Sequence, residues 1–152
     1  MVPRQDIRRE EPAVNFKPEI VLLYCQNCVV EDADLSVAAK ANSRFQAKLV
    51  MMPCASKVEA SHLLKILAQG ADGVVVVGCP YQQCHRLDGS LRAEKRIEYL
   101  KQLLRESGLP AERLGMERGL NLSGLQLMLL AEKRALAVRP LGPNPMKEGL
   151  AA

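Results

Sequence analysis

The stretch Gly73–Gly78, whose sequence is GVVVVG, decides the fold, because four valines bounded by glycines are typical of a fully buried β-strand. A second apolar run, Glu19–Cys25 (EIVLLYC), ends at a polar pair, as a buried parallel strand does. Residues 47–52 (AKLVMM) predict a third strand. Residues 113–120 predict a weaker fourth strand, since two glycines interrupt it.

Helical patterns separate these strands and follow the last one. Residues 58–69 and 90–107 carry apolar side chains at helical spacing, and a glycine follows each segment. Residues 123–138 also predict a helix, and two aspartates can cap another over residues 35–45. Strands that alternate with helices over short loops imply a parallel sheet. The expected fold class is therefore α/β, a small doubly wound, flavodoxin-like sheet of about four strands in the order 2-1-3-4.

Length and composition predict one soluble domain with two short flanking segments. The chain has 152 residues, of which 48% are hydrophobic and 25% are charged, enough for a single core. We expect an extended N-terminal arm over residues 1–18, the α/β domain over 19–138 and an irregular C-terminal tail over 139–152. The apolar runs are too short to cross a bilayer and no signal segment opens the chain, so a cytoplasmic location is expected.

Composition also argues against several classes of function. The chain has no tryptophan and only 3% aromatic residues, and its net charge of +4 is spread out, so a nucleic-acid-binding surface is not expected. Neither a Ser-His-Asp pattern nor a nucleophile elbow is present. The residues after the first strand, 25–31, contain no glycine, serine or threonine that could hold a phosphate group. A flavin or dinucleotide site is therefore not predicted.

Cysteines are the informative residues of this chain. All of them follow the ends of predicted strands, at Cys25, Cys28, Cys54, Cys79 and Cys84. In a parallel sheet these positions share the carboxyl edge, and neighbouring strands are about 4.8 Å apart. Four thiolates could therefore surround one small inorganic centre. An odd number of cysteines in a reducing compartment favours metal binding or redox chemistry over disulfides.

Three kinds of site remain open on the residues alone. Four thiolates hold zinc as well as an iron–sulfur cluster, although structural zinc sites usually pair two closely spaced cysteine motifs. The segment 25–28 (CQNC) is also compatible with a metal-free thiol–disulfide site, but such motifs normally open a helix. Two further residues are candidates to contact a cofactor. His85, directly after Cys84, can donate a hydrogen bond to sulfur, and Lys57 can offset thiolate charge.

Three blocks of sequence carry all five cysteines: residues 25–28 (CQNC), 53–58 (PCASKV) and 68–96 (AQGADGVVVVGCPYQQCHRLDGSLRAEKR). Together they resemble the delta subunit family of methyl-viologen-reducing hydrogenase, a family of small iron–sulfur proteins. The resemblance spans roughly residues 18–138, and its third block, with Gly78-Cys79 and Cys84-His85, is the most specific. The chain departs from the family's usual residues at Ser56-Lys57 and at Ser90, and every cysteine is retained.

The resemblance implies a [2Fe-2S] cluster held by four of the five cysteines, and it leaves open which cysteine is spare. It also implies a non-catalytic electron carrier within a larger oxidoreductase complex. Such a protein passes electrons between a donor, for example a hydrogenase or formate dehydrogenase, and a heterodisulfide-reductase-A-like partner that contains flavin. Related complexes include electron-bifurcating assemblies of the hydrogenase and benzoyl-CoA reductase types. Nucleic acid and membrane are not expected partners.

Overall fold

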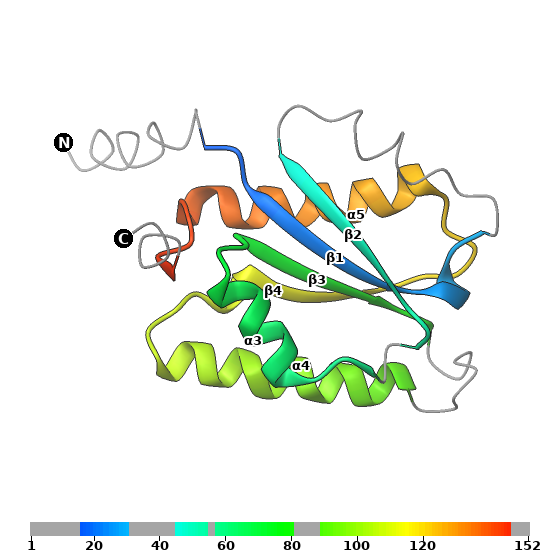
Figure 1. Cartoon of the computed structure of the whole chain (residues 1–152), viewed down its shortest axis with the longest axis horizontal. Helices are drawn as coiled ribbons and strands as arrows, with labels where there is room; N and C mark the ends of the chain where they lie inside the picture. The colour runs from blue at the N-terminus through cyan, green and yellow to red at the C-terminus, as the bar shows by residue number, and fades with distance from the viewer. Residues whose placement is uncertain (1–15, 31–44, 55–56, 81–88, 147–152) are drawn as a thin grey trace.

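A parallel sheet of four strands in the order β2-β1-β3-β4 forms the centre of the protein in the computed structural model (Figure 1). The strands are β1 (Glu19–Cys25), β2 (Gln46–Met52), β3 (Gly73–Gly78) and β4 (Leu114–Arg118). The structure describes residues 16–30, 45–54, 57–80 and 89–146. The α/β fold class, the parallel pairing and the strand order predicted from the sequence are confirmed.

Helices cover both faces of this sheet, with α5 on one side and α3 and α4 on the other (Figure 1). The helices and 3-10 turns are η2 (Gln26–Cys28), α3 (Ala60–Ala68), α4 (Gly89–Glu106), η4 (Ala111–Arg113), α5 (Gly124–Val138) and η5 (Arg139–Leu141). Three predicted helices are thus confirmed to within two residues, while nearly all of the helix predicted over 35–45 lies outside the described residues. In the part of the chain described, none of the helices is long and apolar enough to span a membrane.

Alternation along the strands divides the core into two halves. Leu22, Tyr24 and Val75 belong to the cluster beneath α5. Leu23 and Val76, which are their neighbours in sequence, belong to the cluster beneath α3 and α4. Successive side chains of a strand point to opposite faces, so a strand without polar residues must be covered on both sides. The valine run therefore fixes β3 in the middle of a three-layer domain.

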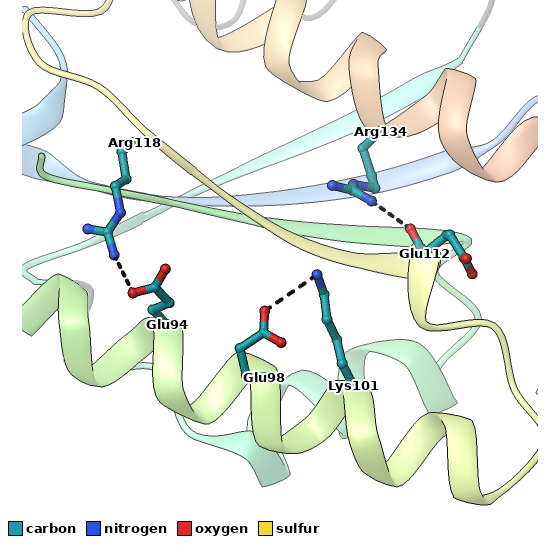
Figure 2. A network of polar contacts seen from close by, with 6 residues as sticks. All are labelled: Glu94, Glu98, Lys101, Glu112, Arg118 and Arg134. Atoms are coloured by element: carbon teal, nitrogen blue, oxygen red, sulfur yellow. Dashed lines mark hydrogen bonds and ion pairs between the residues drawn. The ribbon is translucent and has the colours of Figure 1, made fainter.

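The glycine inside β4 has a structural reason. Gly115 lies beside Arg134 of α5, and a Cβ atom at this position would overlap the guanidinium group. Arg134 Nη1 donates a hydrogen bond of 2.7 Å to the backbone oxygen of Glu112 (Figure 2). Burial lowers the pKa of Arg134, and the carboxylates of Glu117 and Glu112 act in the opposite direction. Gly115, one of the glycines that weakened the prediction of a fourth strand, thus lets α5 pack closely on that strand.

A buried polar network closes the amino-terminal edge of the sheet. The two carboxylate oxygens of Asp72 accept hydrogen bonds from the first backbone amide of β1, at 2.8 Å, and from the Asn144 amide, at 2.9 Å. The Asn144 side chain donates to the backbone oxygens of Leu67 and Ala71, at 2.8 and 2.7 Å. Arg113 Nη1 donates to the Asp72 backbone oxygen at 3.0 Å. These bonds hold the chain after η5 against the domain as far as Asn144.

Candidate metal centre

The carboxyl ends of β1 and β3 bring three cysteines together. In the parallel register Tyr24 pairs with Val77, so the two strands end side by side. Cys25 is the last residue of β1, and Cys79 follows β3 directly. The single turn η2 then places Cys28 beside both of them. This edge is where open parallel sheets normally carry their functional sites.

The sulfur positions suit a metal. The Sγ atoms of Cys25, Cys28 and Cys79 all lie within 4.8 Å of one another. Cys79 Sγ lies 3.5 Å from Cys28 Sγ and 4.0 Å from Cys25 Sγ. Two thiolates bound at about 2.3 Å to one tetrahedral ion are expected about 3.8 Å apart, and the two measured distances lie on either side of this value. The donor set therefore fits three of the four ligands of a thiolate-bound metal.

Burial and mutual contact control the protonation of these thiols. All three are at most 1% exposed and belong to the apolar cluster beneath α5. The hydrogen bond with Cys25, burial and the contact with Cys79 raise the pKa of Cys28. The Cys28 thiol by itself therefore keeps its proton at neutral pH. A metal cation reverses this balance, because a coordinating thiol is deprotonated outright.

Backbone hydrogen bonds hold the turn that carries Cys28. The Leu122 amide donates to the Cys28 backbone oxygen at 2.8 Å, and the Val30 amide donates to the Leu122 oxygen at 2.9 Å. Asn121, just before, has a φ of 54°, a left-handed conformation that asparagine tolerates better than most residues. The segment between β4 and α5 therefore pairs with the residues after β1 and fixes one wall of the site.

A further polar residue at this edge was missed by sequence reasoning. Arg118, the last residue of β4, donates a hydrogen bond of 3.0 Å from Nη1 to the Cys79 backbone oxygen. Its Nη2 contacts Glu94 Oε2 of α4 at 3.0 Å (Figure 2). The available signal was its place at the end of a predicted strand, the same edge that carries the cysteines.

The remaining predicted site residues lie apart from the three thiols or outside the described residues. Cys54 is buried just after β2 but is not a member of the three-thiol group. Cys25 Sγ lies 3.9 Å from the backbone oxygen of Pro53, so Cys54 belongs to the same edge of the sheet. Lys57 is exposed, and its amide donates to the Cys54 oxygen at 3.0 Å. Cys84 and His85 lie outside the described residues.

Comparison with known proteins identifies relatives of this chain. The family model for the methyl-viologen-reducing hydrogenase delta subunit (FlpD) matches residues 20–140. The iron-sulfur subunit of the F420-non-reducing hydrogenase of Archaeoglobus profundus is 32% identical over 128 residues, 84% of this chain and 93% of the relative. The vhu iron-sulfur subunit of the same kind of hydrogenase in Methanocaldococcus jannaschii is 30% identical over 130 residues, 86% of this chain and 97% of the relative.

A second kind of relative is a much longer protein. One of the subunits of the ferredoxin:CoB-CoM heterodisulfide reductase of Methanosarcina mazei, the one designated A, is 32% identical over 97 residues. This segment is 64% of the present chain but only 12% of the relative. A domain similar to this one is therefore part of a longer reductase polypeptide in that organism.

Proposed function

Because the chain belongs to the methyl-viologen-reducing hydrogenase delta subunit family, we propose that it is an electron-transfer subunit that holds a [2Fe-2S] cluster at the carboxyl edge of its sheet. The observation that carries the proposal is the group of three buried thiols within 4.8 Å of one another. Cys25, Cys28 and Cys79 would be ligands, together with either Cys54 or Cys84. A bound cluster supplies one-electron oxidation and reduction.

The chain's own residues provide the environment for that chemistry. The apolar core beneath α5 excludes water from the thiols, and backbone hydrogen bonds from Leu122 and to Cys79 fix two of the ligand-bearing segments. Burial, local charge and hydrogen bonding are the protein's means of setting the potential of an iron–sulfur centre. The domain therefore acts as a rigid holder, and it needs no substrate pocket at the thiols.

The proposed partners follow from the relatives. We place the chain in a hetero-oligomeric complex with a donor oxidoreductase, such as a hydrogenase or formate dehydrogenase, and with a heterodisulfide-reductase-A-like protein that carries flavin and iron–sulfur centres. The Methanosarcina mazei match supports the second partner, since a similar domain is there joined to such a protein. Within an electron-bifurcating complex of this kind the present domain would connect the donor with the flavin. Free cysteines suit the reducing cytoplasm.

Metal and sulfide analysis of the full chain tests this proposal. After anaerobic expression we expect about two irons and two acid-labile sulfides per chain, as a [2Fe-2S] centre requires. The protein should be coloured, and dithionite should produce an EPR signal from the one-electron-reduced cluster. A colourless protein that contains stoichiometric zinc and no iron would contradict the proposal.

A structural zinc site is the second candidate, and one specific observation favours it. All three sulfurs lie close enough to one another to bind a single ion, which is the arrangement of a four-thiolate zinc site. In that case the domain would serve as a scaffold of its complex. Zinc gives no visible absorbance and no redox signal, so the same analysis separates the two candidates.

The geometry disfavours the metal-free thiol–disulfide alternative. Thiol exchange needs an accessible thiolate. Cys25 and Cys28 are at most 1% exposed, and the pKa of Cys28 is raised by its neighbour Cys25, by burial and by Cys79. Both features slow attack on an external disulfide.

A further inference from the structure

Arg118 connects the strand that ends at the thiols with the helix on the other face of the sheet. It is the residue of β4 that pairs with Gly78, immediately before Cys79. From there its guanidinium group makes two contacts of 3.0 Å, one to the Cys79 backbone oxygen and one to Glu94 Oε2. Figure 2 shows the side chain extending from β4 toward Glu94 on α4. The Arg118 side chain is 18% exposed, so most of it is shielded from water.

Cys79 needs this contact because it lies just beyond the ladder of β3. The last backbone oxygen of that strand, on Gly78, accepts a hydrogen bond of 3.1 Å from the Gly119 amide. The next oxygen, on Cys79, belongs to a residue that is 1% exposed, and a buried carbonyl group must find a partner. Arg118 provides a charged donor, which makes a stronger bond than a neutral one.

Cys79 is also the central residue of the thiol group. Its sulfur makes both of the short contacts, to Cys28 and to Cys25. A backbone shift at Cys79 would therefore change two of the sulfur–sulfur distances at once. Glu94 holds the guanidinium group from its other side, so the position of Arg118 is fixed by two different elements.

We propose that Arg118, oriented by Glu94, is a positioning residue of the metal centre that fixes the Cys79 ligand and places a positive charge beside it. The inference rests on the proposed function, since it assigns a role toward the group that the thiols would hold. Fixing the backbone keeps the three sulfurs at binding distance. The positive charge favours the more negative, reduced state of the centre, so it raises the midpoint potential.

Substitutions can separate position from charge. Arg118→Gln removes the charge and the two-point contact. Arg118→Lys keeps the charge, but a single ammonium group does not reproduce the planar fork of arginine. Glu94→Gln leaves the arginine and removes its charged partner. Glu117→Gln is the matched control, because Glu117 precedes Arg118 on β4 and forms a separate ion pair with the exposed Lys133.

The experiment measures Co²⁺ affinity of the metal-free full chain against a competing chelator, and the midpoint potential of the iron-loaded full chain. We expect Arg118→Gln to bind Co²⁺ about tenfold more weakly, the lower end of the usual effect of removing a residue that orients a metal ligand. Arg118→Lys and Glu94→Gln should show smaller losses, and Glu117→Gln none. The midpoint potential should fall in Arg118→Gln and stay near the wild-type value in Arg118→Lys.

Wild-type Co²⁺ affinity in Arg118→Gln, or a midpoint potential that does not move, overturns the inference. If Arg118→Gln does not fold, as judged by circular dichroism, the affinities of Arg118→Lys and Glu94→Gln decide, and wild-type values for both overturn it. Failure of the proposed function has a different signature. The wild-type chain would then contain no iron, and the ranking of Co²⁺ affinities alone would decide whether Arg118 positions Cys79.

Discussion

The two ends of the parallel sheet are equally buried but chemically opposite. At the amino edge, Asp72, Arg113 and Asn144 are each at most 3% exposed, and they bond to one another and to backbone oxygens and amides. At the carboxyl edge, buried sulfur atoms face one another across 3.5 to 4.0 Å. A thiol is a weak hydrogen-bond donor and a weak acceptor, so such contacts do not replace a polar network.

This difference shows which edge is built for the fold and which for a ligand. The amino edge satisfies its polar groups internally, as buried polar groups in stable proteins do. The carboxyl edge gathers atoms whose shared property is affinity for soft metals. Removing residues from the two edges should therefore have opposite signatures, one in stability and the other in metal content.

The largest effect is expected for Cys79→Ser. Cys79 makes both short sulfur contacts, and a serine hydroxyl is a poor ligand for iron or zinc in a thiolate site. Bound iron should fall to background in metal analysis of the purified full chain, while the far-ultraviolet circular dichroism spectrum of the sheet and helices persists.

Matched controls for this loss come from the two cysteines outside the three-thiol group. A four-ligand centre needs only one of Cys54 and Cys84, so one of the variants Cys54→Ser and Cys84→Ser should retain its iron and the other should not. Retention of full iron content by Cys79→Ser would show that the gathered thiols are not the ligands.

At the amino edge, Asn144→Ala should reduce stability and leave metal binding unchanged. The substitution removes two donated hydrogen bonds and leaves the buried backbone oxygens of Leu67 and Ala71 without these donors. We expect a loss of about 3 kcal/mol in the free energy of unfolding, measured with urea. Gln102→Ala, which removes an exposed bond to Glu106 on α4, is the control and should cost under about 0.5 kcal/mol. Loss of metal in Asn144→Ala would show that the two edges are coupled.

Most of the fold was predictable because its signals are local. The run Gly73–Gly78, the strand Glu19–Cys25 and the apolar spacing of three helices lie in short windows of sequence, and the parallel sheet follows from their alternation. The fourth strand was the weak point. Its Gly115 is explained only by Arg134, which contacts it from a helix that comes later in the chain.

The site was predictable as a place but not in its details. Strand ends put the cysteines at one edge, and the close group of Cys25, Cys28 and Cys79 agrees with that expectation. The separation of Cys54 from this group and the contact of Arg118 with Cys79 depend on how loops turn after the strands. Asn144 is out of reach for the same reason, because 72 residues separate it from Asp72.

The pH dependence of the metal-free protein should differ between the edges. The pKa of Cys28 is raised above its ordinary value of 9.0, so the folded chain keeps this proton when the unfolded chain has lost it. Stability is therefore complete below about pH 9 and falls above it, by up to about 1.4 kcal/mol per pH unit. Urea unfolding between pH 8 and pH 10 measures this slope.

Two variants separate the sources of that slope. Cys28→Ser should flatten it, because the titrating thiol is gone. Asn144→Ala carries no change in a titratable group, so it should lower the whole curve without changing its slope. An equally steep decline in Cys28→Ser would assign the pH dependence to groups away from the thiols.

The smallest expected effect tests whether every residue near the carboxyl edge serves the metal. Ser123 lies directly after Leu122, which bonds to Cys28, and its side chain caps α5 by accepting from the Gln126 amide at 3.2 Å. Gln126 in turn accepts from the Ser123 amide at 2.8 Å, which completes a capping box. Ser123→Ala should therefore cost about 1 kcal/mol in urea unfolding and leave Co²⁺ affinity unchanged. A drop in affinity as large as that of Arg118→Gln would mean that the start of α5 also positions the thiols, and the division between an edge for the fold and an edge for a ligand would then run through the carboxyl edge itself.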